Sequence, residues 1–205
     1  MVSSETRPRL IGIAGPSCAG KSEVAQRVAA ALAAPVISLD SYYTDLGHIA
    51  FQERERANFD APDALDRKLL AGQLAKLAEC AEIRVPVYDF ARHVRAAETR
   101  SVRAATYAVV EGLFALYWED VRRLFHTKVF IQAEDAVCFK RRLERDVMER
   151  GRTPESVHAQ YRNTVRPMAE LHIIPTSRFA DLVLSGTDPV EQSVEAVLAH
   201  VLGDS

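Results

Sequence analysis

A glycine-rich loop near the start of the chain constrains the fold more than any other feature of the sequence. Residues 15–22 read GPSCAGKS and match the pattern of Gly, four residues and Gly-Lys-Ser/Thr, which wraps the phosphates of nucleoside triphosphates. An apolar run over residues 10–14 precedes the loop, and residues 23–32 have helical spacing. The sequence therefore predicts strand, loop and helix in the order that such a loop needs. A chance match in a glycine-rich turn would lack these flanking elements.

This loop has the chemistry to hold phosphates. Its glycines allow a tight turn that approaches an anion, and exposed N–H groups and the dipole of the following helix attract negative charge. Lys21 is expected to reach the β- and γ-phosphates, and Ser22 is expected to give its hydroxyl to Mg²⁺. The predicted phosphate-binding residues are Gly15, Pro16, Ser17, Cys18, Ala19, Gly20, Lys21 and Ser22.

Composition and charge exclude several classes of protein. The net charge is −2, with 26 Lys and Arg against 28 Asp and Glu, so no overall field attracts nucleic acid or an anionic membrane. Three cysteines, Cys18, Cys80 and Cys138, have no paired spacing, which argues against a disulfide framework or a zinc site and for a reducing compartment. No apolar run has transmembrane length. The sequence therefore predicts a cytoplasmic enzyme with neither a nucleic-acid partner nor a membrane partner.

Strand and helix patterns alternate along the 205 residues, which are expected to form one domain. Such alternation is typical of an α/β fold with a mostly parallel sheet and helices on both faces. Pro86 indicates an edge strand, Pro167 an interrupted helix, and Asp188 with Pro189 the start of the last helix. The predicted strands cover residues 10–14, 35–40, 83–88, 107–111, 128–131 and 181–184. The predicted helices cover residues 23–32, 51–56, 64–78, 119–125, 134–150 and 154–174, with a last one from residue 188.

Two acidic residues end predicted strands at the edge of the sheet that also carries the loop, where ligands of such sheets bind. Glu111 is expected to hold Mg²⁺ beside Ser22, directly or through water, although taken alone it fits an exposed acid at a strand end equally well. Asp40 could orient an acceptor hydroxyl and take its proton. An ordinary Asp pKa of about 3.9 makes a weak base, which suffices where the proton leaves late in phosphoryl transfer.

Arginines cluster in the helix predicted over residues 134–150 and in the segment after it. Arg142 and Arg145 are three residues apart and therefore share a face. Guanidinium groups arranged in this way suit closure over transferring phosphates. A solvated charged helix with internal Glu–Arg pairs is the alternative, and the pattern alone favours it narrowly.

Among proteins with such a phosphate loop, a small-molecule kinase fits best. A GTPase switch protein would need an Asn-Lys-x-Asp motif for guanine, and neither Asn58 nor Asn163 begins one. A motor ATPase usually needs a larger assembly domain than this length can hold. The kinase class is therefore favoured.

Short motifs with a distinctive combination follow the phosphate loop along the chain. They read SLDSYY (38–43), NFDAPDA (58–64), YDFARH (88–93), VEG (110–112), RRLERD (141–146), ERGR (149–152), QY (160–161) and FAD (179–181). With these motifs the chain resembles the uridine kinase (uridine–cytidine kinase) family of P-loop kinases. The resemblance covers about residues 9–185 in the family's order, and its motifs are specific in combination, although the loop alone is shared with many kinases. Cys18, Ser22 and Glu23 depart from the residues common in the family without changing the expected chemistry.

The resemblance implies transfer of the γ-phosphoryl group of ATP to the 5′-hydroxyl of uridine or cytidine, giving UMP or CMP with Mg²⁺ as cofactor. Asp40 would be the base, and Lys21 and Arg145 would share in catalysis. Arg145 and Arg150 would reach the phosphates from a closing lid. The resemblance also implies feedback inhibition by CTP or UTP and a homo-oligomer. The domain prediction is a single P-loop kinase domain over residues 1–205, with a nucleoside-binding insertion at about 40–105 and a lid at about 140–165.

The same resemblance implies a nucleoside site. Asp60 and Arg142, with Gln160 assisting, would hold the 2′- and 3′-hydroxyls of the ribose. The residues implied to read the edge of the pyrimidine are Tyr88, His93 and Arg152, and those implied to pack on its ring are Phe59 and Phe90. The full implied nucleoside-binding set is Asp40, Tyr43, Phe59, Asp60, Tyr88, Phe90, His93, Arg142, Arg152 and Gln160.

Two other functions stay open from the sequence. A phosphoribulokinase would bind an acceptor with a phosphate and no base, and would need extra cations and fewer aromatic residues than residues 40–93 contain. A nucleotide-binding regulatory protein without catalysis is the other alternative, and the presence of both Lys21 and Asp40 argues against it. Residues alone leave the phosphate donor and the preference between uridine and cytidine undetermined.

Overall fold

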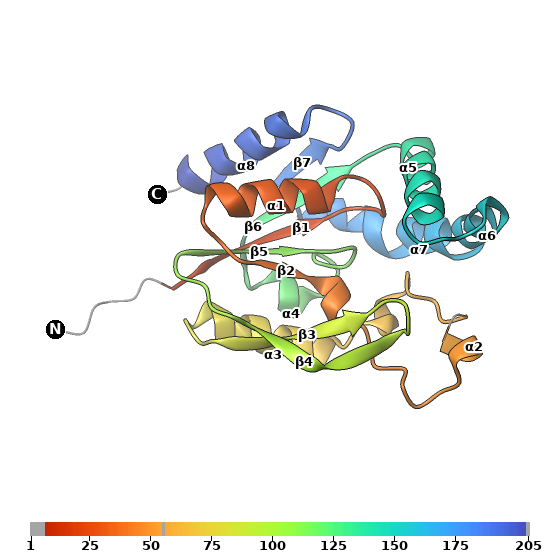
Figure 1. Cartoon of the computed structure of the whole chain (residues 1–205). Helices are drawn as coiled ribbons and strands as arrows, with labels where there is room; N and C mark the ends of the chain where they lie inside the picture. The colour runs from red at the N-terminus through yellow and green to blue at the C-terminus, as the bar shows by residue number, and fades with distance from the viewer. Residues whose placement is uncertain (1–6, 55, 204–205) are drawn as a thin grey trace.

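The computed structural model describes residues 7–54 and 56–203, and a parallel sheet lies at its centre (Figure 1). Among these residues the sheet has five strands in the order β2-β5-β1-β6-β7, and each neighbouring pair is parallel. The prediction of a mostly parallel α/β sheet is therefore confirmed. The strands are β1 (Arg9–Ala14), β2 (Val36–Ser38), β5 (Tyr107–Glu111), β6 (Phe125–Gln132) and β7 (Leu182–Ser185).

Helices cover both faces of the sheet, as the sequence predicted. Two helices lie together on one face, and two others lie on the opposite face (Figure 1). The first pair is α1 (Lys21–Ala31) and α8 (Val190–Gly203), and the second is α3 (Arg67–Ala78) and α4 (Glu119–Arg122).

Strand β1 explains why the molecule has a hydrophobic core on each side of the sheet. Ile11 and Ile13 pack in the cluster that includes the buried side of α1 and α8, whereas Leu10 and Ala14 pack in the cluster that includes α3. Successive side chains of a strand point to opposite faces, and a parallel sheet buries both. The central strands are therefore apolar throughout, which is the pattern that made them recognisable in the sequence.

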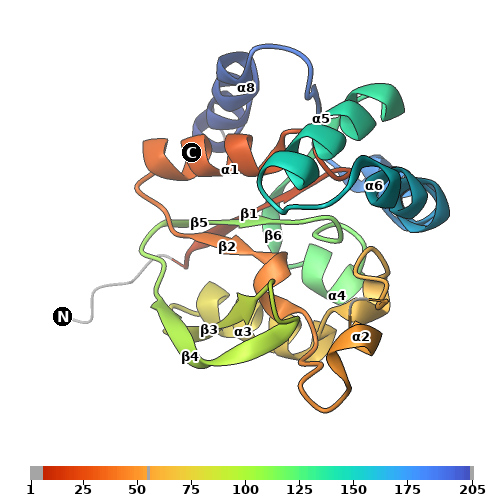
Figure 2. The same ribbon diagram turned by 45° about the vertical axis from the view of Figure 1, so that its right-hand side comes forward.

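An antiparallel hairpin lies beside α3, away from the parallel sheet (Figure 2). Its strands are β3 (Ile83–Asp89) and β4 (Val94–Val102). In a two-stranded sheet each strand is an edge, so the edge position predicted from Pro86 is confirmed. Strand β4 was not among the predicted strands, because most of its residues are exposed and they lack an apolar alternation. Near the hairpin, the chain from β2 to α3 forms the short helix α2 (Phe51–Arg54) and 3₁₀ turns at Leu39–Tyr42 and Pro62–Ala64.

A long helical path runs from β6 back to β7. It begins with α5 (Asp135–Met148) and α6 (Pro154–Gln160). A π-helical turn, Tyr161–Val165, then leads into α7 (Arg166–Met168), a second π-helical turn and a 3₁₀ turn that ends at Phe179. Pro167 lies between the π-helical turns. Proline cannot donate the helical hydrogen bond, so the predicted interruption of this helix is confirmed as a change of helical geometry.

A few predicted boundaries differ from the structure. Phe125 was placed at the end of a helix, but α4 ends at Arg122 and Phe125 begins β6, where its ring packs in the core. The last helix begins at Val190 instead of directly after Asp188, which is a shift of the size usual at helix ends. Among the described residues, no helix is both long and apolar enough to cross a membrane.

Candidate active site

The phosphate loop connects β1 to α1 and has the backbone that a glycine-rich sequence permits. At Gly15, φ is +152° and a Cβ atom would lie 2.3 Å from the carbonyl oxygen of Ile131. Gly20 caps the start of α1 with φ at +107°, a conformation that other residues rarely adopt. Cys18 also has a left-handed backbone, with φ at +62°. The loop therefore keeps its shape through its own backbone and through close contact with β6.

Lys21 and Ser22 begin α1, directly after the loop. The Lys21 ammonium lies 3.4 Å from the carbonyl oxygen of Pro16, so its side chain folds back over the loop. The Ser22 hydroxyl donates to the Glu111 carboxylate at 3.0 Å. Glu111 is only 7% exposed at the end of β5, and the sheet therefore brings together the two residues predicted to bind metal. A hydroxyl and a carboxylate oxygen side by side are ligands that suit Mg²⁺.

Asp40 lies next to this pair, in the 3₁₀ turn that follows β2. The turn is capped by Ser38, whose hydroxyl accepts from the Asp40 backbone N–H at 3.4 Å. Burial and the negative charge of Glu111 raise the pKa of Asp40 above its ordinary value, although nearby cations, with Lys21 first among them, partly offset the rise. A carboxylate with a raised pKa is a stronger base than an ordinary Asp.

Asp60 and Arg142 form a buried ion pair beside the phosphate loop. Asp60 is 6% exposed and Arg142 is 5% exposed, and the guanidinium Nη1 lies 3.5 Å from Asp60 Oδ1. The same Nη1 donates to the Ser17 hydroxyl of the loop at 2.9 Å, and Nη2 donates to Gln160 at 3.1 Å. Arg142 therefore contacts Asp60 and Gln160, which are predicted to hold the ribose, and also contacts the predicted phosphate loop.

Aromatic side chains line up next to Asp60. The Phe59 ring stacks on His93 with centroids 4.8 Å apart and an interplanar angle of 22°. Tyr43 meets Phe59 edge-on at 5.2 Å and Tyr88 at 5.4 Å. Phe90 is the outlying member, because it is 55% exposed and meets only the edge of Tyr88 among the rings of this group. We call Tyr43, Phe59, Asp60, Tyr88, His93, Arg142, Arg152 and Gln160 the acceptor site.

The Tyr88 hydroxyl is buried without a hydrogen-bond partner, as are two other side-chain atoms among the described residues, Arg9 Nη1 and Arg142 Nε. Burial raises the pKa of Tyr88 to about 12, so the hydroxyl keeps its proton and can donate. A buried donor without a partner costs free energy unless a ligand or water satisfies it. A hydroxyl donor without a protein partner, placed among aromatic rings, suits a ligand with a flat polar ring, which could pack on the rings and accept this hydrogen bond.

The remaining predicted arginines gather around a residue that the sequence did not single out. Arg145, Arg150 and Arg152 each contact the carboxylate of Asp146, which is fully buried. Arg141 is a second residue that was missed: its Nη1 donates to the Gly186 carbonyl at 2.9 Å and to the Cys18 carbonyl at 3.4 Å, and so ties α5 to the loop. The Arg-rich pattern pointed to this helix but did not distinguish these roles from those of its neighbours.

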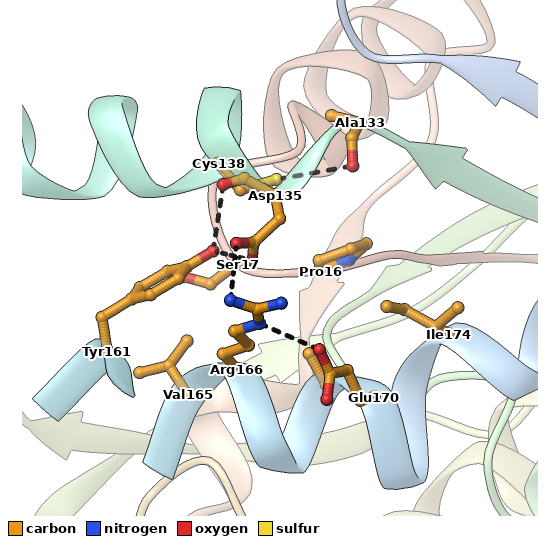
Figure 3. Close-up of a pocket in the computed structure, with 11 residues that line it drawn as sticks. Pro16, Ser17, Ala133, Asp135, Cys138, Tyr161, Val165, Arg166, Glu170 and Ile174 are labelled. Atoms are coloured by element: carbon orange, nitrogen blue, oxygen red, sulfur yellow. Dashed lines mark hydrogen bonds and ion pairs between the residues drawn. The ribbon is translucent and has the colours of Figure 1, made fainter. Parts of the chain in front are cut away.

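A small cavity of about 60 Å³ lies behind the phosphate loop, between the start of α5 and the π-helical path (Figure 3). Figure 3 shows Tyr161 and Arg166 both reaching toward Asp135, and the Tyr161 hydroxyl donates to Asp135 at 2.8 Å. Ligand sites usually have volumes of about 300–1,000 Å³, so this cavity cannot hold a nucleoside. None of the residues that line this cavity belongs to the acceptor site.

The fold and the site together define a kinase with a phosphate loop on a parallel sheet. A family model described as the phosphoribulokinase/uridine kinase family matches residues 10–191. The chain belongs to this family. Similar curated proteins include a uridine kinase of Deinococcus deserti, which is 40% identical over 203 residues and covers 98% of each chain. A uridine kinase of Chloroflexus aggregans is 40% identical over 197 residues, which are 95% of this chain and 94% of the relative.

Solved structures support the fold. A putative fructose transport system kinase from Silicibacter sp. TM1040 has a TM-score of 0.73 at 21% identity and covers 89% of this chain and 92% of its own. Phosphoribulokinase from Rhodobacter spheroides has a TM-score of 0.67 at 15% identity, over 91% of this chain and 75% of its own. At these identities the likeness concerns the architecture alone.

Proposed function

We propose that this chain transfers the γ-phosphoryl group of ATP to the 5′-hydroxyl of uridine or cytidine. The observation that carries the proposal is Arg142, whose Nη1 atom contacts both Ser17 of the phosphate loop and the buried Asp60. A carboxylate that can accept from a ribose diol thus lies directly beside the place for a triphosphate. The near full-length identity of 40% to uridine kinases supports the same activity.

The chemistry follows from the residues around the end of β5. The nucleoside oxygen forms a bond to the γ-phosphorus as the bond from that phosphorus to the β,γ-bridging oxygen breaks, and ADP leaves with the electron pair. Asp40 accepts the proton of the hydroxyl, and its raised pKa favours that transfer. Lys21 and Arg145 stabilise the charge on the transferring group, because fixed cations in a crowded site act more strongly than in water. Asp40 therefore acts on the acceptor hydroxyl, whereas Lys21 and Arg145 act on the transferring phosphoryl group.

Magnesium fits the paired oxygens of Ser22 and Glu111. Among the described residues, no group of three His, Cys, Asp or Glu side chains could hold a metal by itself. Mg²⁺ is usually held in kinases by one or two protein oxygens together with phosphates and water, which matches this pair. When bound there, Mg²⁺ would neutralise charge on the phosphates of ATP.

The acceptor site suits a pyrimidine ribonucleoside better than a sugar phosphate. Phe59 and His93 offer stacked rings, and the unpaired Tyr88 hydroxyl offers a donor for the edge of a base. A phosphorylated sugar has no flat ring to cover these groups. The phosphoribulokinase reading is therefore disfavoured for this chain.

A phosphorylation panel tests the proposal. The purified protein would be incubated with ATP and Mg²⁺ and with uridine, cytidine, adenosine, thymidine or ribulose 5-phosphate, and the products identified by mass spectrometry. We expect UMP or CMP to form fastest. Faster phosphorylation of ribulose 5-phosphate would replace the proposed substrate, and ATP binding without transfer to any acceptor would support a regulatory protein instead.

Regulation, assembly and location extend the proposal. Inhibition by CTP or UTP, a homo-oligomeric state and a cytoplasmic location follow from the resemblance to uridine kinases and from the cysteine pattern, and they stay predictions. Inhibition kinetics with CTP and light scattering of the purified protein would test the first two.

A further inference from the structure

Asp146 on α5 is a fully buried carboxylate surrounded by guanidinium groups. Four arginines contact it: Arg142, Arg145, Arg150 and Arg152. A buried carboxylate is costly unless it is paired, and removing one partner of a buried pair is strongly destabilising. Through Arg142 it is connected to Ser17 of the phosphate loop and to Asp60 of the acceptor site.

The two oxygens of this carboxylate divide the arginines by function. Oδ1 contacts Arg145, whose Nε and Nη2 lie at 2.9 and 2.8 Å, and Arg150, whose Nη1 lies at 3.6 Å. Oδ2 contacts Arg142 Nε at 3.5 Å and Arg152 Nη1 at 3.4 Å. The first pair is the one assigned above to phosphates, and the second is the one assigned to the nucleoside.

The contact with Arg145 fixes the orientation of a flexible side chain. Hydrogen bonds from both Nε and Nη2 to one carboxylate oxygen restrain the rotation of the guanidinium, and they do not use its Nη1 donors. Arg145 and Arg150 also lie close enough to Asp40 to lower the pKa of that carboxylate. Both arginines therefore lie near Asp40 while Asp146 holds them.

Asp146 also contacts the segment that follows α5. The Arg152 N–H donates to the Asp146 carbonyl at 3.0 Å, and the Arg152 and Arg142 side chains share Gln160 as acceptor, at 2.5 and 3.1 Å. One residue thus anchors the segment that carries Arg150 and Arg152. Arginines that need no reorganisation when substrates bind contribute more to the transition state.

We infer that Asp146 is a positioning residue for phosphoryl transfer, and that its carboxylate holds the phosphate-side and nucleoside-side arginines in one fixed arrangement. The inference rests on the proposed function for the roles of the two pairs. Asp146 itself touches no substrate and acts through Arg142, Arg145, Arg150 and Arg152.

Asp146→Asn separates this role from a simple effect of charge. Loss of a negative charge near a triphosphate should strengthen ATP binding if charge alone mattered. Loss of the anchor should instead lower kcat, by about 10- to 100-fold, because the amide NH₂ group cannot pair with guanidinium. The expected result is a large fall in kcat with an unchanged or lower KM for ATP. A kcat within about threefold of wild type would overturn the inference.

Glu144→Gln is the matched control. It removes one carboxylate from an exposed position on the same helix, two residues away from Asp146. We expect wild-type kcat in this variant. A loss of kcat as large as that of Asp146→Asn would show that any lost charge on α5 has the same effect, which would overturn the inference.

A double variant tests whether Asp146 works through Arg145. The double variant Asp146→Asn/Arg145→Gln should lose less kcat than the product of the two single losses, because part of the effect of Asp146 is exerted through Arg145. A merely structural role would make the two losses multiply, and that result would contradict the inference.

A second cycle applies if Asp146→Asn fails to fold. Arg150 and Arg152 are 45% and 31% exposed and contact different oxygens of the same carboxylate. If Asp146 couples them, the double variant Arg150→Gln/Arg152→Gln loses less kcat/KM than the product of the single losses. If the two single losses multiply, Arg150 and Arg152 act independently of each other, and that result would overturn the inference.

The assays also separate this inference from the proposed function. Hydrolysis of ATP by water, measured without nucleoside, uses Arg145 and the phosphate loop but no acceptor site. If the wild type hydrolyses ATP but phosphorylates no pyrimidine nucleoside, the proposed function is wrong. The role of Asp146 can still be tested in that case, because Asp146→Asn is expected to slow the hydrolysis of ATP. A wild type active on uridine, with Asp146→Asn equally active, would remove only the inference.

Discussion

The phosphate loop is made by consecutive residues between β1 and α1, whereas the acceptor site collects side chains from residues 43–93 and 142–160. The loop presents mainly backbone, and its shape depends on left-handed positions such as Gly20. The acceptor site presents side chains, and its members keep their places through contacts with one another, as Phe59 does with His93.

This difference teaches where substrate choice lies. A backbone loop held by neighbouring strands is insensitive to the acceptor, so it can serve many kinases. Side chains gathered from separate segments can be exchanged one at a time, so they decide which acceptor is used. Arg142 joins the two regions, because the same guanidinium contacts Ser17 and Asp60.

The largest expected effect on kcat comes from Asp40, which is predicted to take the proton of the acceptor hydroxyl. Asp40→Asn should lower kcat by about 10²- to 10⁴-fold, because the amide keeps the shape but cannot take the proton. The KM for uridine should change little. Steady-state kinetics with uridine measure both values, and a kcat within about threefold of wild type would exclude Asp40 as the base.

A change in the phosphate loop should act on every acceptor alike. Lys21→Ala removes a charge aimed at the transferring group and should lower kcat by about 10²- to 10³-fold with uridine and with cytidine. Circular dichroism and a thermal melt would show that the fold is kept. Normal turnover in this variant would rule out the phosphate-loop assignment.

A smaller effect is expected from a single contact of the acceptor site. Tyr88→Phe removes the unpaired hydroxyl, so kcat/KM for uridine should fall by about 2- to 13-fold, the value of one neutral hydrogen bond. Stability should not fall, because no protein partner is lost.

Tyr42→Phe is the control for that variant. The Tyr42 hydroxyl donates to Gln73 at 2.8 Å, and Tyr42 is a fully buried core residue. Its loss should lower the free energy of unfolding and leave uridine kinetics unchanged. The opposite outcome, with Tyr88→Phe destabilised and fully active, would remove Tyr88 from the acceptor site.

The smallest effect is on stability. Burial, followed by the charge of Glu111, raises the pKa of Asp40 in the folded protein. The folded state then holds this proton more tightly than the unfolded chain, so stability falls as pH rises from the unfolded pKa, about 3.9, through the raised one. Asp40→Asn should therefore unfold at higher urea than wild type at neutral pH, and the gain should vanish in acid. The exposed Asp63→Asn serves as control, and an equal gain there would contradict the explanation.

The two regions also differ in how far the sequence predicted them. The loop could be predicted because its residues are adjacent and its flanking strand and helix have clear periodicity. Strand β4 could not, since its exposed residues show no apolar alternation. Asp146 lies in an Arg-rich helix whose pattern alone narrowly favours a solvated surface, and only the fold shows that this carboxylate is buried.

Membership in the acceptor site was predicted from motif likeness and not from spacing. The segments that carry Asp60, Tyr88 and Gln160 are far apart in the chain, and periodicity cannot say which side chains meet. Phe90 belongs to a matching motif and lies largely exposed at the margin of the rings, and its packing on a base stays a prediction. The roles of these residues stay predictions until variants are measured.

The central claim is that the acceptor site recognises a ribose through Asp60. Removing the 2′-hydroxyl of uridine leaves this carboxylate short of a donor, at a cost of about 1–3 kcal/mol, or roughly 5- to 150-fold in kcat/KM. The most direct measurement is the ratio of kcat/KM for uridine to that for 2′-deoxyuridine, in wild type and in Asp60→Ala. We expect a large ratio in wild type that shrinks toward one in the variant. An equal ratio in both proteins would contradict the account.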